Sequence, residues 1–292
     1  MLFIEIFKSL RPKQWIKNLF IFAPLIFSRN LLDKPLLLKT IVAFVTFCLL
    51  SSAHYIFNDL QDLEEDKLHP LKSQRPLASG RLQKPAAVVA MIVLGTVGFG
   101  LALTINEYFF LIGVFYVVLQ IAYSLWLKHV VILDIFVIAA GFLIRVVAGG
   151  LAIRVDISHW LLICTMLLSL FLAMGKRRHE LVLLNRSAMS HRPILKEYNT
   201  YLLDQMISVV TASTLVAYCL YTISEETVAK FGTANLIYTV PFVLYGIFRY
   251  LYLIHQKAGG GSPESLIIED KPLLLDTFLW IVAAVLILGT RK

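Results

Sequence analysis

Long apolar runs separated by short polar segments dominate the pattern of hydrophobic and polar positions in this chain. About 20 apolar residues in a helix are enough to cross the hydrocarbon core of a bilayer, where a helix satisfies its own backbone hydrogen bonds. We therefore predict an all-α, polytopic membrane helical bundle of about nine transmembrane helices. Apolar runs of suitable length cover residues 18–31, 36–57, 86–105, 108–127, 131–152, 157–175, 202–223, 233–254 and 272–290.

The first run is the weakest of the nine, because Pro24 interrupts it. The composition supports the membrane prediction, since 58% hydrophobic residues and a mean hydropathy of +0.76 lie outside the range of soluble proteins. We expect a single transmembrane domain over residues 1–292. Glu5, Lys8 and Arg11 stand where a cleavable signal peptide would need an apolar core, so we expect no such peptide.

Positive charge collects on one side of the predicted membrane. If the N-terminus is cytoplasmic, the cytoplasmic loops are 58–85, 176–200 and 256–271, and they carry most of the Lys and Arg residues, as the positive-inside rule requires. The formal net charge of +8 then follows from topology and anionic lipid, so nucleic acid is not an expected partner. We expect an integral protein of a bacterial plasma membrane with its site toward the cytoplasm. Homo-oligomer formation is left open.

A short acidic segment follows the second run. Residues 58–66 read Asn-Asp-Leu-Gln-Asp-Leu-Glu-Glu-Asp and hold five carboxylates, whose mutual repulsion indicates that a cation binds among them. On a helix, Asp59, Asp62 and Asp66 fall within roughly 60° of one another around the axis. Such an open set of oxygen ligands suits Mg²⁺, which keeps waters and is completed by substrate phosphates. The alternative is a solvated acidic loop.

Two basic groups accompany the acidic segment. Lys72 and Arg75 follow it closely, and the sixth run ends in a stretch with Lys176, Arg177 and Glu180 at helical spacing. Carboxylates that hold a metal, beside cations that hold phosphate oxygens, are what a diphosphate site needs. The alternative is that these cations belong only to ordinary positive-inside loops.

Two charges lie inside the fifth run. Asp134 and Arg145 are 11 residues apart, which places them about 16 Å apart on nearly the same helix face. Charges at that depth usually face a water-filled cavity, so both are candidate substrate contacts. Lys17, Tyr123 and Lys128 lie at span ends, where phosphate contact and interfacial anchoring are equally good interpretations.

The acidic segment resembles the NDxxDxxxD motif of the UbiA superfamily of intramembrane prenyltransferases. Asn58, Asp59, Asp62 and Asp66 stand at the motif positions, and the likeness in span number and loop placement extends over nearly the whole chain. The resemblance implies a helical bundle around a central cavity, with Mg²⁺ at the acidic motif and a lateral opening for an isoprenoid chain.

The chain departs from that pattern after the sixth span. Superfamily members that use a prenyl diphosphate donor carry a second aspartate-rich motif there, whereas this chain has Lys176-Arg-Arg-His-Glu180. Fixed cations in place of metal ligands favour substrates with additional phosphate groups. The departure resembles the superfamily branch that uses phosphoribosyl pyrophosphate as donor and a polyprenyl (decaprenyl-like) phosphate as acceptor. The stretches that carry this likeness are Arg11–Asn18, Asn58–Asp62, His69-Pro, Arg75–Gly80, Gly141–Arg145, Gly175-Lys-Arg and Gly259–Glu264.

The resemblance assigns roles to the charged residues. Asp59, Asp62, Lys176 and Arg177 would be catalytic, and Asp59, Asp62 and Asp66 would hold Mg²⁺. The substrate-binding residues would be Lys17, Asn58, Asp66, Lys72, Arg75, Tyr123, Lys128, Asp134, Arg145 and Glu180. The implied reaction transfers a 5-phosphoribosyl group and releases pyrophosphate, as a precursor step for a cell-envelope polysaccharide.

Two alternative functions stay open. The first is a prenyltransferase with a prenyl diphosphate donor and a quinone-precursor or other acceptor. The second is a non-enzymatic carrier of a phosphorylated lipid, which would use the same charged cavity.

Overall fold

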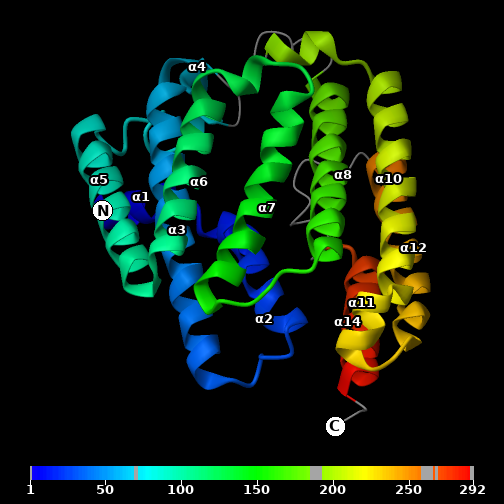
Figure 1. Cartoon of the computed structure of the whole chain (residues 1–292). Helices are drawn as coiled ribbons and strands as arrows, with labels where there is room; N and C mark the ends of the chain where they lie inside the picture. The colour runs from blue at the N-terminus through cyan, green and yellow to red at the C-terminus, as the bar shows by residue number, and fades with distance from the viewer. Residues whose placement is uncertain (1, 69–71, 185–192, 258–265, 267–268, 290–292) are drawn as a thin grey trace. The chain divides into compact units, whose positions relative to one another are not determined.

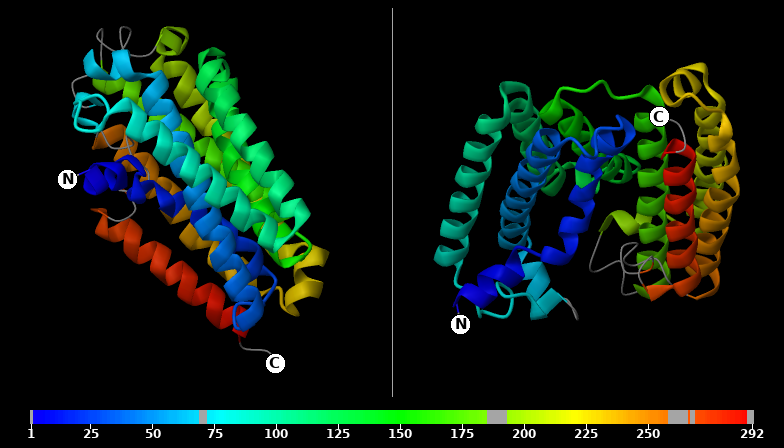
Figure 2. Two further views of the ribbon diagram at one scale, coloured as in Figure 1. Left: turned by 90° about the vertical axis from the view of Figure 1, so that its left-hand side faces the viewer. Right: turned by 90° about the horizontal axis from the view of Figure 1, so that it is seen from below.

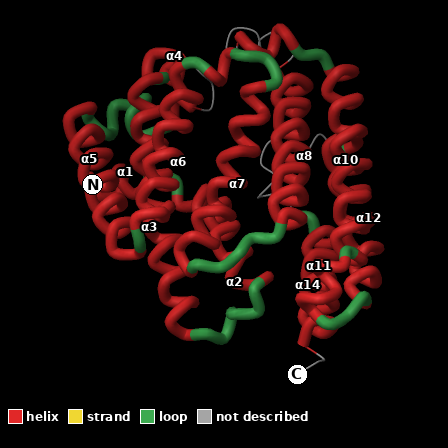
Figure 3. Tube along the Cα trace, viewed as in Figure 1, coloured by secondary structure: helices red, strands yellow, loops and turns green. Residues whose placement is uncertain are grey.

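The computed structural model of this chain describes residues 2–68, 72–184, 193–257, 266 and 269–289. These residues form helices joined by loops, with no β-strand among them (Figures 1 and 3). Eight of the described helices are long and apolar enough to cross a membrane. The prediction of an all-α membrane bundle is therefore confirmed.

The first predicted span, residues 18–31, is not one long helix. Pro12–Phe22 form a 3-10 helix, η1, and the following α2 covers only Ala23–Phe27. Proline has no N–H, so Pro24 fits in the first turn of a new helix, where that N–H would have no partner within the helix. The count of nine spanning helices is thus not confirmed in the described part of the chain.

The chain divides into two compact units, Met1–Ile157 and Ser158–Lys292, which we describe separately. That they form one domain stays a prediction. The long helices of unit 1 are α3 (Lys34–Gln61), α5 (Lys84–Ile105), α6 (Glu107–Leu125) and α7 (Leu133–Ile153), which pack lengthwise (Figure 2). Its shorter elements are α1 (Leu2–Ser9), η1, α2, α4 (Leu63–Leu68), η2 (Lys72–Gln74) and η3 (Leu127–His129).

Polar caps mark where two long helices of unit 1 begin. The side chain of Asp33 accepts a hydrogen bond from Leu36 N at the start of α3, and Asn106 accepts one from Phe109 N at the start of α6. Each cap satisfies a backbone donor that lacks a partner within the helix. Helix α7 is the inner helix of this unit, since 67% of its most apolar stretch is buried against 11% in α5.

A small core beside the end of α3 holds a loop in place. Ile56, Leu63, Leu77 and Leu82 are buried together, and Ile6 of α1 packs against them. Burial of these side chains anchors the segment after η2, which carries Arg75, against α1 and α3.

Unit 2 consists of a second set of packed helices. They are α8 (His159–Leu184), η5 (Pro193–Glu197), α10 (Thr200–Ile223), α11 (Glu225–Phe231), η6 (Asn235–Thr239), α12 (Val240–Gln256) and α14 (Lys271–Gly289). Helix α10 packs against α8, and α12 packs against α10 and α14. Gly175 allows a close approach of α12 to α8, because a Cβ there would lie 3.3 Å from the ring of Tyr250.

An ion pair includes the residue that caps the start of α14. Arg249 of α12 donates to both Asp270 oxygens, at 3.0 and 2.8 Å, and Asp270 Oδ1 accepts from Leu273 N at 2.9 Å. The Arg249 hydrogen bonds are the main reason why the pKa of the Asp270 carboxyl lies below its ordinary value. Asp270 therefore caps α14 in its ionised form.

Candidate functional site

The carboxyl-terminal end of α3 carries buried acids paired with arginines. Asp59 is 2% exposed and Asp66 is 1% exposed. Arg75 Nη1 lies 3.0 Å from Asp59 Oδ1 and also donates to Asp66 Oδ2. Arg11 donates to the same Asp59 oxygen, and its guanidinium lies 5.1 Å from the centre of the Tyr55 ring. The two buried carboxylates thus face one shared cationic position.

Asp62 belongs to a separate polar group. Helix α3 ends at Gln61 with Asp62 as its C-cap. The Asp62 carboxylate accepts hydrogen bonds from Lys128 Nζ at 2.9 Å and from Asn58 Nδ2 at 2.8 Å. Asn58 Oδ1 in turn accepts from Ser124 Oγ at 3.0 Å. The single acidic face expected from the sequence is divided in two, with Asp59 and Asp66 in one group and Asp62 in the other.

The contacts of these acids allow a test of whether they fit Mg²⁺. Arg75 Nη1 demonstrates that one cation can touch oxygens of both Asp59 and Asp66. Asp66 Oδ1 is buried and accepts no hydrogen bond from the described residues, with Lys72 Nζ 3.7 Å away. Hard carboxylate oxygens with spare capacity fit Mg²⁺. Within the described ranges, no group of three or more His, Cys, Asp or Glu residues could hold a metal ion, so water and substrate phosphates would have to complete the coordination.

The last turns of α8, in unit 2, carry the second predicted group. Arg177 is 1% exposed, and its Nη1 donates to Glu180 Oε2 at 2.8 Å. Lys176 is half-buried. Residues 176–180 hold three cations and one carboxylate. Because that carboxylate is engaged by Arg177, this end of α8 suits phosphate oxygens better than a second metal ion.

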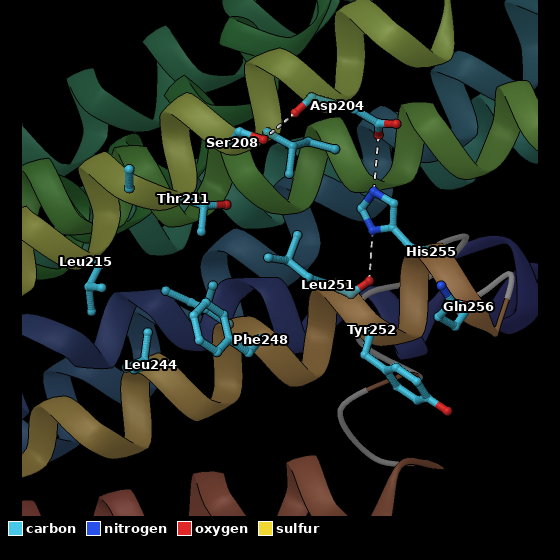
Figure 4. Close-up of a pocket in the computed structure, with 13 residues that line it drawn as sticks. Asp204, Ser208, Thr211, Leu215, Leu244, Phe248, Leu251, Tyr252, His255 and Gln256 are labelled. Atoms are coloured by element: carbon cyan, nitrogen blue, oxygen red, sulfur yellow. Dashed lines mark hydrogen bonds and ion pairs between the residues drawn. The ribbon is translucent and has the colours of Figure 1, made fainter.

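A neighbouring polar cluster joins α8, α10 and α12. Arg178 Nε donates to Asp204 Oδ1 at 2.6 Å and Arg178 Nη1 donates to Ile254 O at 3.2 Å. His255 Nε2 lies 3.2 Å from the same Asp204 oxygen. Asp204 and His255 line one end of a groove of about 720 Å³ between α10 and α12, and Figure 4 shows apolar side chains such as Leu215, Leu244 and Phe248 along the rest of it.

The remaining predicted residues lie in several places. Lys17 on η1 and Tyr123 on α6 are half-buried, and Asp134 is fully buried in the first turn of α7. Arg145 is 5% exposed in the middle of α7, among neutral polar groups. The glycine-containing loop Gly259–Glu264 and the His69-Pro pair fall outside the described residues.

The sequence pattern did not single out three of the charged contacts. Arg11 stands in the sequence only within a stretch that resembles the family, although it donates to Asp59, and no motif marks Asp204 or His255. Arg11 has a φ of 54°, a left-handed conformation that is uncommon for a residue other than glycine. No periodicity in the sequence signals that turn, whereas the Arg-Pro pair at 11–12 does indicate a helix start after Arg11.

The sequence is similar to known proteins over most of its length. The model of the UbiA prenyltransferase family matches residues 19–282. The chain is 32% identical over 286 residues to decaprenyl-phosphate phosphoribosyltransferase of Corynebacterium glutamicum, covering 96% of this chain and 85% of that protein. It is also 32% identical over 279 residues to the protein of the same name from Mycobacterium tuberculosis, covering 94% and 91% of the two chains.

A solved structure shares the fold. The UbiA homolog from Archaeoglobus fulgidus bound to DMAPP and Mg²⁺ superimposes with a TM-score of 0.74, covering 98% of this chain and 100% of that one. Its sequence is only 16% identical to this chain, so the comparison shows the fold and no more.

Proposed function

This chain belongs to the UbiA prenyltransferase family, and we propose that it transfers a 5-phosphoribosyl group from phosphoribosyl pyrophosphate to a polyprenyl phosphate. The observation that carries the proposal is the 32% identity, over 94–96% of the chain, to proteins named decaprenyl-phosphate phosphoribosyltransferase. The basic end of α8 supports it, because fixed cations there suit a donor with an additional phosphate group.

The reaction needs little covalent chemistry from the protein. An oxygen of the lipid phosphate attacks the anomeric carbon of the ribose, the bond from that carbon to the pyrophosphate oxygen breaks, and pyrophosphate leaves with the electron pair. The attacking oxygen is already ionised near neutral pH, so no general base is assigned. Attack from the face opposite the leaving group inverts the sugar carbon, through an oxocarbenium-like state.

The side chains of unit 1 would bind the pyrophosphate of the donor. Mg²⁺ held by Asp59 and Asp66, with Asp62 as a further candidate, would neutralise charge on the leaving group. Arg75 and Lys72 already lie against these carboxylates and would turn toward the phosphate oxygens. Lys128, which donates to Asp62 near the end of α3, would contribute another cation.

In unit 2, Lys176 and Arg177 would bind phosphate oxygens of a substrate. Arg177 is oriented by Glu180, and a guanidinium held in this way loses little freedom when it binds phosphate. The eight apolar helices make the protein an integral membrane protein. We further propose that the site faces the cytoplasm of a bacterial plasma membrane and that the product is a precursor of a cell-envelope polysaccharide.

The test is a membrane assay with phosphoribosyl pyrophosphate, polyprenyl phosphate and Mg²⁺. We expect pyrophosphate release by the wild type and a loss of about 100-fold or more in Asp59→Asn and in Lys176→Ala, as for removal of other preorganised charge-stabilising groups. Glu64→Gln and Lys67→Ala are matched controls, because both residues are exposed and pair only with each other in the described contacts. Undiminished turnover in Lys176→Ala would remove the role assigned to the end of α8.

Two variations of this assay distinguish the alternative functions. A family member that uses a prenyl diphosphate donor would consume labelled prenyl diphosphate and leave labelled phosphoribosyl pyrophosphate intact. A carrier would move the lipid phosphate across liposomes without releasing pyrophosphate. Either result would contradict the proposed reaction.

A further inference from the structure

The segment of residues 10–22, which we call the N-terminal strap, is attached to α3 by side-chain hydrogen bonds. Ser52 Oγ donates to Leu10 O at 3.0 Å, and Trp15 Nε1 donates to Ser52 Oγ at 3.1 Å. Further along, the buried Asn18 donates through Nδ2 to Ser51 Oγ at 3.3 Å. These three hydrogen bonds between uncharged groups hold the strap to α3, in addition to the contact that Arg11 makes with Asp59.

Helix α7 holds the other side of the strap. Arg145 Nε donates to Asn18 Oδ1 at 2.7 Å. One turn further along α7, a Cβ on Gly149 would overlap the carbonyl oxygen of Ile21. The backbone of the strap thus passes so close to α7 that only a residue without a side chain fits at position 149.

The surroundings of Arg145 identify it as part of this attachment. Its Nη1 donates to Gly141 O at 2.6 Å and its Nη2 donates to the Tyr116 hydroxyl at 2.9 Å. The guanidinium also lies 4.9 Å from the centre of the Tyr116 ring, a favourable cation–π distance. With Asn18, these contacts engage all three guanidinium nitrogens, so the side chain is held in one orientation within α7.

The strap begins with a residue of the candidate site. Arg11 adopts a left-handed conformation with φ 54° directly before Pro12, and its guanidinium donates to Asp59. Because Pro12 restricts the backbone that follows, the position of Arg11 depends on where the strap lies along α3 and α7. A shift of the strap by about 1 Å would move the Arg11 guanidinium far enough to lower the rate of a reaction that depends on its contact with phosphate.

We propose that Asn18, Arg145 and Gly149 are positioning residues that seat the N-terminal strap and thereby place Arg11 at Asp59. This inference rests on the proposed function only in assigning Arg11 to the donor site. In this proposal Arg145 does not contact the substrate. It acts by holding Asn18, which lies about two turns of η1 away from Arg11.

The experiment is a double-mutant cycle between Gly149→Ala and Arg11→Gln, read out as kcat/KM for pyrophosphate release. We expect Gly149→Ala alone to lower kcat/KM by about 10-fold or more. In the Arg11→Gln background, Gly149→Ala should lower kcat/KM by less than about 2-fold, because the effects of substitutions at coupled residues are not additive. Equal losses in both backgrounds would overturn the proposal.

Hydrogen exchange supplies a readout that does not depend on turnover. Gly149→Ala should speed amide exchange in peptides from residues 10–22, since local opening governs exchange. Gly95→Ala is the matched control, because it is also a helical glycine and a Cβ there meets nothing within 4 Å. Unchanged exchange in Gly149→Ala would also overturn the proposal.

Two further comparisons keep the test decisive. If Gly149→Ala fails to fold, Asn18→Ala replaces it in the same cycle with the same expected non-additivity. If the wild type releases no pyrophosphate from phosphoribosyl pyrophosphate, the proposed function fails, while the exchange measurements still decide whether Gly149 seats the strap.

Discussion

Arg75 contacts two buried carboxylates of the candidate site, Asp59 and Asp66. Its replacement should therefore change the stability of the protein and the dependence of that stability on Mg²⁺. In Arg75→Gln, Asp59 keeps Arg11 and Asp66 keeps only Lys72 at 3.7 Å. Glutamine retains a hydrogen-bond donor but not the positive charge. We expect the variant to be less stable than the wild type in the absence of divalent ions and to recover when Mg²⁺ is added.

The size of the loss follows from the contacts. A hydrogen bond to a charged group contributes about 1.5–3 kcal/mol, and breaking a buried ion pair costs about 3–5 kcal/mol. Arg75 makes two such contacts, but its side chain is 25% exposed and other cations remain. A loss of about 2–3 kcal/mol in the free energy of unfolding is therefore expected. Mg²⁺ at 100 times its dissociation constant would return about 2.7 kcal/mol.

The assay is thermal denaturation in detergent with EDTA and then with Mg²⁺, applied to the wild type, Arg75→Gln and Arg81→Gln. Arg81 lies in the same loop but is 48% exposed, with Nε 3.5 Å from Glu5, so its replacement should change the midpoint little. Mg²⁺ should raise the midpoint of Arg75→Gln more than that of the wild type, in which the guanidinium competes for the same oxygens. Equal Mg²⁺ shifts in both proteins, or equal losses in both variants, would refute this reasoning.

Two further predictions concern unit 2. Because the pKa of Asp270 is lowered by Arg249, its carboxylate stabilises the fold above its ordinary pKa near 4, and that contribution disappears as the pH falls through the lowered pKa. The difference in thermal midpoint between the wild type and Asp270→Asn should therefore be present at about pH 6 and disappear as the pH falls through the lowered pKa. A difference that persists in acid would contradict this prediction. Arg178→Met should lower the free energy of unfolding by about 1–2 kcal/mol, since it removes the contacts to Asp204 and Ile254 O. In a double-mutant cycle followed by denaturation, Asp204→Asn should lower the free energy of unfolding of Arg178→Met only a little further. Fully additive losses would show that Arg178 and Asp204 do not interact.

Much of the fold was predictable from the sequence because hydropathy alone determines which segments can lie in lipid. Eight long helices occupy predicted runs, and the acidic segment does lie at the end of α3. The first run was not confirmed as one spanning helix, because hydropathy says nothing about backbone geometry and a separate short helix with Pro24 in its first turn begins there. Family resemblance supplied the expected chemistry, which composition alone would have left open.

The arrangement of the acidic group was less predictable, because Asp59, Asp62 and Asp66 share one face only on a continuous helix through Asp66. The chain instead ends α3 at Gln61 and starts α4 at Leu63. Asp62 then reaches Lys128, which is 66 residues away in sequence. Neither that contact nor the contact between Arg11 and Asp59 follows from local spacing, since both depend on how separate helices pack.

The contrast between the buried α7 and the largely exposed α5 has a consequence for how this chain can change over evolutionary time. Lipid distinguishes only apolar from polar side chains, so the exposed positions of α5, such as Val89, Ile92 and Val93, can exchange Leu, Ile, Val and Phe almost freely. On α7 each exchange alters a packed contact or the route of the N-terminal strap. A saturation-mutagenesis library should therefore retain many apolar variants in α5 and few in α7, and natural sequences that diverge from this one should accumulate their neutral differences mainly on the outer helix.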